Sequence, residues 1–220
     1  MAYSDVGIAN IALIRIGAKR ISSLTEDSES AIVVNAVWQY IRDEVLSARD
    51  WHFAKVRVAL AKNVTTPAYN FDYAYTIPSD FLRLCRQDRM DASVFPSGLY
   101  SEEFFTGQLY LNNVYYQYKI ETISDGTICL FSDYDNTDDS LFITYIKRIT
   151  DSTKFSPAFV NCFANRLGAE IATSITESRA KFQDMMNMYE SSLKKAESQN
   201  MSLDYQDETG NDNWEMSGRD

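Results

Sequence analysis

The chain has 220 residues, of which 45% are hydrophobic, so one domain of generous size, or one domain with appendages, can bury a core without disulfide support. Its 31 acidic residues outnumber the 21 basic ones and give a formal net charge of −10, which argues against a protein that grips the DNA backbone through a basic patch. No apolar run approaches the ~18 residues of a membrane-spanning helix, and the first residues lack the basic segment of a signal peptide.

Two helices are predicted within residues 1–50. The first spans Asp5 to Ile16, with Ser4 as its N-cap and Gly17 as a left-handed stop. The second runs from about Glu26 to Ala48, with Thr25 as its N-cap. Its apolar residues recur at spacings of four and three, as in a packed helix face, at Val34, Trp38, Ile41, Val45 and Ala48.

The pattern changes over residues 51–152, where short apolar or alternating runs are punctuated by Pro67 and Pro78. These runs predict a small antiparallel β region. Its clearest strands are residues 108–111, 115–120, 127–131 and 141–149. The sequence Ser124-Asp125-Gly126 predicts a hairpin turn between two of them, because Asp-Gly readily supplies a positive φ.

Helical spacing returns over residues 153–199. Ser156 followed by Pro157 is a helix start, and apolar residues then recur every four positions from Phe159 to Ile175. A second helix is expected from Ser178 to Ser198. The predicted fold class is α+β: a helical bundle from the N- and C-terminal helices, with the β region inserted between them.

Residues 200–220 are predicted to be an extended acidic tail. Six acidic residues against one basic residue give this tail a net charge of −5, half that of the chain. The acidic residues are Asp204, Asp207, Glu208, Asp212, Glu215 and Asp220, against Arg219. Leu203, Tyr205 and Trp214 are spaced as anchors, so we expect a strap that binds a partner; the alternative is a tail that only aids solubility.

No residue pattern indicates catalysis, a metal ion or a cofactor. The single histidine, His52, lies near Asp50 without a serine or cysteine motif, so its expected role is structural. The acidic run Asp133 to Asp139 begins like an EF-hand loop, but Asp138 stands where glycine is needed and Thr144 where a bidentate glutamate belongs. The scattered Cys85, Cys129 and Cys162 suit a reducing cytoplasm and are expected to be small buried hydrophobic residues.

Several motifs together resemble one family, the tail tubular protein A family of short-tailed bacteriophages. The resemblance covers the chain through Arg83, continues in layout only over the β region, and extends to the placement of the C-terminal helices. Its motifs are 9–17 (ANIALIRIG), 23–28 (SLTEDS), 42–46 (RDEVL), 51–54 (WHFA) and 75–83 (YTIPSDFLR).

The resemblance implies a head-to-tail adaptor in the virion neck, assembled in the host cytoplasm. Such proteins form a ring of twelve copies below the portal protein and join it to the tail nozzle, a tail tubular protein B-like protein. The ring encloses the channel through which DNA leaves, without sequence-specific binding, membrane, cofactor or catalysis. An acidic surface suits that channel because it repels the passing DNA.

Residue roles follow from the matching motifs. Trp38 and Trp51 would anchor the bundle core, and Pro78 and Asp80 would set the turn into the β region. The expected interface residues are the tail anchors together with Arg42, Asp43 and Glu44, which are candidates for salt bridges within or between subunits.

Two other functions compete with the adaptor. One is a non-catalytic acidic interaction module, such as a scaffold or a DNA mimic. The other is a metal-dependent enzyme using Asp50, His52 and the run from Asp133 to Asp139.

Overall fold

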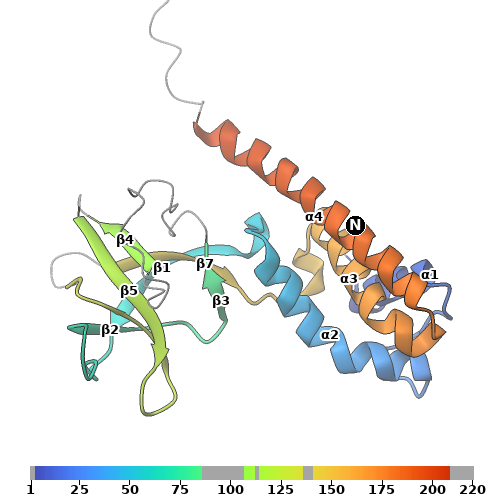
Figure 1. Cartoon of the computed structure of the whole chain (residues 1–220), viewed down its shortest axis with the longest axis horizontal. Helices are drawn as coiled ribbons and strands as arrows, with labels where there is room; N and C mark the ends of the chain where they lie inside the picture. Colours follow the sequence, from blue (N-terminus) through green and yellow to red (C-terminus); the bar gives the residue numbers. More distant parts are fainter. Residues whose placement is uncertain (1–2, 86–106, 112–113, 136–140, 209–220) are drawn as a thin grey trace, which may run out of the picture. The chain divides into compact units, whose positions relative to one another are not determined.

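Two units make up the protein in a computed structural model that describes residues 3–85, 107–111, 114–135 and 141–208 (Figure 1). The helical unit joins Met1–Phe53 to Ile149–Asp220, and the β unit is Ala54–Arg148. The α+β class, with a β region inserted between N- and C-terminal helices, is therefore confirmed.

The helical unit contains four α-helices among the described residues. They are α1 (Asp5–Arg15), α2 (Glu29–Ala48), α3 (Pro157–Thr176) and α4 (Arg179–Glu208). Two short 3-10 turns, η1 (His52–Ala54) and η4 (Ser152–Lys154), lie where the chain passes between the two units. None of the helices that the structure describes has the length and apolar character needed to cross a bilayer.

Three of the predicted helix ends are confirmed. The Ser4 hydroxyl accepts a hydrogen bond from the Gly7 backbone amide at 3.1 Å. The Ser156 hydroxyl does the same for Phe159 at 3.3 Å. Gly17 has a φ of 74°, the left-handed conformation that glycine adopts without steric cost as it ends α1.

The start of α2 differs from the expectation, because Ser28 rather than Thr25 is its N-cap. The Glu26 carboxylate accepts hydrogen bonds from the Ser22 amide at 2.7 Å and the Ser22 hydroxyl at 2.6 Å. The Ser28 hydroxyl donates to Glu26 at 2.8 Å and accepts from the Ala31 amide at 3.3 Å. These bonds hold Glu26 in a turn and delay the helix to Glu29.

The end of α4 also differs from the expectation. The helix was predicted to end at Ser198, yet its backbone continues to Glu208 and includes Leu203 and Tyr205. No Pro or Gly follows Ser198 until Gly210, so no helix-breaking residue interrupts it. The part of the predicted tail that contains Trp214 lies outside the described residues.

The core of the helical unit is α3, which packs against α1, α2 and α4. Its buried residues lie on every side of the helix: Phe159, Val160, Cys162, Phe163, Ala164, Asn165, Leu167, Gly168, Ala169, Ile171 and Ala172. A methyl group at Gly168 would lie 2.7 Å from the Met185 Cε of α4 and 3.6 Å from the Ala12 carbonyl of α1. The absence of a side chain at Gly168 therefore leaves room for the end of the Met185 side chain, whereas the distance to α1 is an ordinary van der Waals contact.

An aromatic cluster closes one end of this core. Phe159 is fully buried, and its ring lies 5.1 Å from that of Trp51 in an edge-to-face arrangement and 4.6 Å from that of Phe155. The Trp51 indole also donates a hydrogen bond to the Val45 carbonyl at 2.9 Å. Trp38 packs on Phe163 with 4.7 Å between ring centroids. Both tryptophans thus contribute to the bundle core as expected.

The β unit is a curled antiparallel sheet with the strand order β3-β7-β1-β2-β6-β5-β4. The strands are β1 (Lys55–Lys62), β2 (Tyr73–Thr76), β3 (Phe81–Leu84), β4 (Gly107–Leu111), β5 (Val114–Thr122), β6 (Ile128–Ser132) and β7 (Leu141–Lys147). Only the end of β1 pairs with β2, so two groups of strands meet at a short junction.

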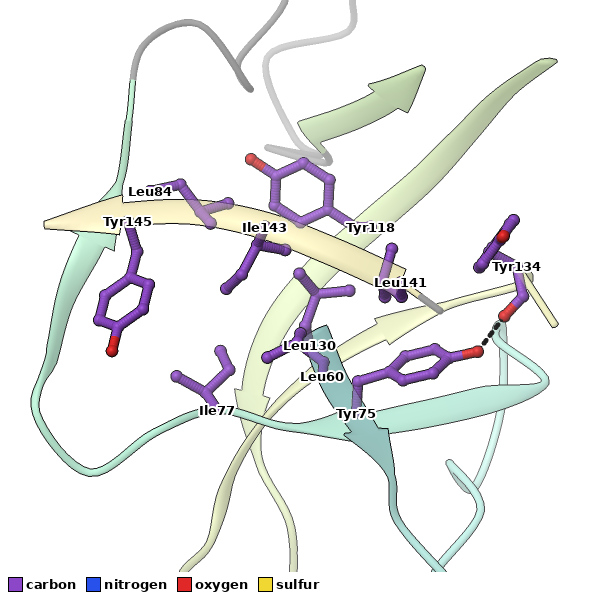
Figure 2. Packing of buried hydrophobic residues seen from close by; sticks show 10 residues of the cluster. All are labelled: Leu60, Tyr75, Ile77, Leu84, Tyr118, Leu130, Tyr134, Leu141, Ile143 and Tyr145. Carbon is purple, nitrogen blue, oxygen red and sulfur yellow. Dashed lines mark hydrogen bonds between the residues drawn. The ribbon is translucent and has the colours of Figure 1, made fainter. Parts of the chain in front are cut away.

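The curl of the sheet encloses one apolar core that both strand groups supply (Figure 2). Leu60, Leu141 and Ile143 come from β1 and β7, while Tyr75 and Leu130 come from β2 and β6. The Tyr75 hydroxyl, which would be costly to bury alone, donates a hydrogen bond to the Tyr134 carbonyl.

Two turns of the β unit follow the expectation. At the hairpin between β5 and β6, Gly126 has a φ of 88° and its amide donates to the Ile123 carbonyl at 2.9 Å. After Pro78, the Asp80 carboxylate accepts from the Tyr145 hydroxyl at 2.9 Å and pairs with Lys147 at 2.8 Å. Burial would raise the pKa of Asp80, but these two partners hold it below its ordinary value and fasten the turn to β7.

We expect Phe159→Ala to lower the free energy of unfolding by about 3–5 kcal/mol, because it leaves a cavity at the centre of the aromatic cluster. Phe182→Ala is the matched control: this ring is 37% exposed, and its loss should cost less than about 1 kcal/mol. Urea unfolding of both variants checks the difference. Equal losses would show that the cluster is not the core of the bundle.

The turn before α2 predicts a specific pH dependence. Hydrogen bonds from Ser22 lower the pKa of Glu26 to about 2, below its value in an unfolded chain. The resulting stabilisation is fully present above the unfolded pKa of about 4.3 and is lost as the pH falls towards 2. The melting temperature of Glu26→Gln should therefore lie below that of the parent at pH 7, and this gap should shrink at pH 3. Asp27→Asn, a neighbouring change of the same charge, should show no such gap.

Candidate functional site

The outer face of α2 carries an exposed apolar stripe. Ile32 is 57% exposed, Tyr40 is 65% exposed, and Ala36 lies exposed between them at the same four-residue spacing. Residues four apart lie on one side of a helix, so these three form a continuous surface. We call Ile32, Ala36 and Tyr40 the α2 stripe.

Charge is absent from this part of α2. No residue from Ser30 to Ile41 is charged, although 24% of the chain is Asp, Glu, Lys or Arg. A solvent-facing helix surface ordinarily carries charged side chains. Asn35 and Gln39 are exposed beside the stripe and are polar but uncharged. An apolar stripe on an uncharged helix face of an acidic protein therefore marks a surface that can be covered by a partner.

The predicted interface residues Arg42, Asp43 and Glu44 lie at the C-terminal end of α2 and form salt bridges within the chain. The Arg42 side chain is 8% exposed, and its guanidinium pairs with Asp43 at 2.8 Å. Glu44 accepts from the Arg166 side chain of α3 at 2.9 Å. Of the two predicted possibilities, salt bridges within or between subunits, the structure therefore shows those within the chain for all three residues.

Arg166 links α2 and α3 through two carboxylates. Besides Glu44, its guanidinium binds Glu170, one turn along α3, at 2.7 Å. Burial alone would lower the pKa of Arg166, but the two carboxylates raise it above its ordinary value. Nothing in the sequence pattern singled out Arg166, although its i,i+4 spacing to Glu170 is a sequence-level sign of an ion pair.

A polar layer continues from Arg166 towards α4. Arg49, just after α2, pairs with Glu197 of α4 at 3.1 Å. Burial and the nearby Glu44 charge raise the pKa of Tyr189 to about 12. One carboxylate oxygen of Glu44 is buried without a hydrogen-bond partner among the described residues. A buried water would satisfy that oxygen.

A separate network joins α1, α3 and α4 around the buried side chain of Asn165, which is 2% exposed. Its amide nitrogen donates to the Met188 carbonyl at 3.2 Å and to the Ser192 hydroxyl at 3.3 Å. Its amide oxygen accepts from Arg15 of α1, which also donates to the Asn161 side chain at 2.8 Å. Burial lowers the pKa of Arg15. Four residues of this network line a groove between α3 and α4, namely Asn161, Asn165, Met188 and Ser192.

His52 and the described aspartates of the acidic run, which were considered together for catalysis or metal binding, belong to different units. His52 is exposed in η1, within the helical unit. In the β unit, Asp133 accepts from the Asp72 amide at 3.0 Å. Asp135 accepts from Lys62 at 3.1 Å and from the Tyr73 hydroxyl at 3.0 Å. These two aspartates thus fasten the loop after β6.

Residues 136–140 of the acidic run lie outside the described residues. Among the residues that the structure does describe, no group of three or more His, Cys, Asp or Glu side chains is arranged to hold a metal ion. The three cysteines are free and buried, as expected. Burial raises the pKa of the Cys129 and Cys162 thiols, which makes both less reactive as nucleophiles.

No protein-family model matches the chain, and no curated protein matches its sequence significantly.

The Glu44–Arg166 pair gives a prediction about stability. A double-mutant cycle of Glu44→Gln and Arg166→Met should show a coupling of about 1–2 kcal/mol, because Arg166 is only 12% exposed. The same cycle on the exposed pair Asp151 and Lys154, 3.9 Å apart, should show no resolvable coupling. Chemical denaturation supplies the free energies. Absence of coupling at Glu44 would contradict a within-chain role.

Proposed function

We propose that this protein is a structural virion protein, a ring-forming adaptor that joins the portal to the tail nozzle of a short-tailed bacteriophage. The motifs from Ala9 to Arg83 support this proposal through their order and spacing. The physical observation that carries it is the α2 stripe, which each copy of the chain presents to solvent when it is alone.

In this proposal, a second copy of the same chain covers the α2 stripe. A ring is built by a heterologous contact, in which one surface of each copy covers a different surface of the next. With a net charge of −10, neighbouring copies repel each other unless they meet through an uncharged area. The segment from Ser30 to Ile41 supplies such an area.

The remaining features agree with an adaptor that encloses a DNA channel. The helical unit is stabilised by a continuous apolar core around α3, so it can act as a rigid subunit. The acidic excess of the chain disfavours adhesion of DNA during retention and ejection of the genome.

Charge on the stripe should abolish assembly. We expect Ile32→Asp combined with Tyr40→Asp to prevent ring formation, because two desolvated carboxylates would oppose burial of the stripe. The melting temperature should stay close to that of the parent, since both side chains are more than half exposed. Native mass spectrometry and negative-stain imaging, with and without the candidate portal protein, provide the readout.

The matched control adds the same two charges elsewhere on the helical unit. Thr173→Asp with Ser174→Asp places them at exposed positions of α3 and should leave assembly unchanged. The portal arm is needed because adaptors can assemble only on their portal. A parent protein that remains monomeric after addition of the portal would refute the adaptor function.

A further inference from the structure

A shallow, open groove between α3 and α4 has a volume of about 400 Å³. We call it the α3–α4 groove. Its lining residues are Asn161, Asn165, Asn187, Met188, Ser191, Ser192 and Lys195. Apart from Met188, which is 46% exposed, these side chains carry amides, hydroxyls or an ammonium group.

Positive charge in and beside the groove lacks acidic partners among the described residues. Within the described ranges Arg15 donates three hydrogen bonds, all to amide oxygens, two on Asn161 and one on Asn165. No carboxylate in that part of the chain forms an ion pair with Arg15 or with Lys195. The carboxylates of Asp184 and Glu190, on the same helix, do not line the groove.

This arrangement suits a carboxylate-bearing peptide. Guanidinium and ammonium groups bind carboxylates through charge-assisted hydrogen bonds, and amide and hydroxyl groups bind the peptide backbone. Met188 offers an apolar contact, and the methionine thioether packs well on aromatic rings. A ligand with acidic residues around one aromatic anchor therefore matches the groove.

We infer that the α3–α4 groove binds residues 209–220 of a second copy of this chain. This segment carries Asp212, Glu215 and Asp220 against Arg219, with Trp214 between the first two acidic residues. Its twelve residues span up to about 40 Å when extended, while the groove from Asn187 to Lys195 covers about 12 Å of helix.

A second copy is a better donor than the chain itself. From Lys195 the backbone of α4 runs thirteen residues further to Glu208, so the helix ends about 20 Å from the groove of the same chain. The segment would then have to reverse direction to return. The inference rests on the proposed function only in requiring a neighbouring copy, and its test uses the purified chain without a portal.

Photo-crosslinking tests the inference directly. The full chain carries benzoylphenylalanine in place of Trp214 and is mixed, at high concentration, with ¹⁵N-labelled chain of natural sequence. We expect cross-links from position 214 to Met188 or Ser191 of the other isotope, at 50 mM salt. The yield should fall severalfold at 500 mM salt, because the contact depends on exposed charges.

Two charge reversals on the acceptor copy provide a matched comparison. Lys195→Glu lies in the groove and should lower the yield about fivefold, whereas Lys194→Glu, exposed on the same helix but outside the groove lining, should leave it unchanged. Glu215→Lys on the donor should restore the yield with Lys195→Glu. Cross-links confined to one copy, cross-links to other surfaces, no cross-links, or equal effects of the two reversals would each overturn the inference. A failed ring with an intact cross-link would refute only the adaptor function.

Discussion

The helical unit depends on the burial of α3. Because apolar residues from Phe159 to Ala172 occupy every side of this helix, no single neighbour can cover it. α1 and α2 come from the start of the chain and α4 from its end, so both ends must meet around α3 before the unit is stable. The β unit is then necessarily an insertion between them, with its own core enclosed by the curled sheet.

Two arginines border this apolar core and differ in their partners. Arg166 pairs with Glu44 and Glu170, and the resulting network carries little uncompensated charge between α2 and α3. Among the described residues Arg15 instead donates to amide oxygens, and in the proposed contact its positive charge binds a carboxylate of another copy. The same residue type thus fastens helices at one place and favours an acidic ligand at the other.

The two proposed contacts between copies use different forces. The α2 stripe is apolar and uncharged, so its burial is driven by the hydrophobic effect and tolerates salt. The α3–α4 groove and residues 209–220 are polar and charged, so that contact gains specificity and weakens with salt. A strap of this kind adds avidity once a stable contact has brought two copies together.

The features that depend on neighbouring residues in the chain could be predicted from the sequence. The caps at Ser4 and Ser156, the glycine turn at Gly126 and the α+β class all follow from local hydrogen bonds, backbone freedom and hydrophobic periodicity. The strand order, the pairing of Glu44 with Arg166 and the network that joins Arg15 to Asn165 are visible only in the tertiary structure. Arg15 and Asn165 are 150 residues apart, and such contacts depend on which helices pack together, which no short stretch of sequence specifies.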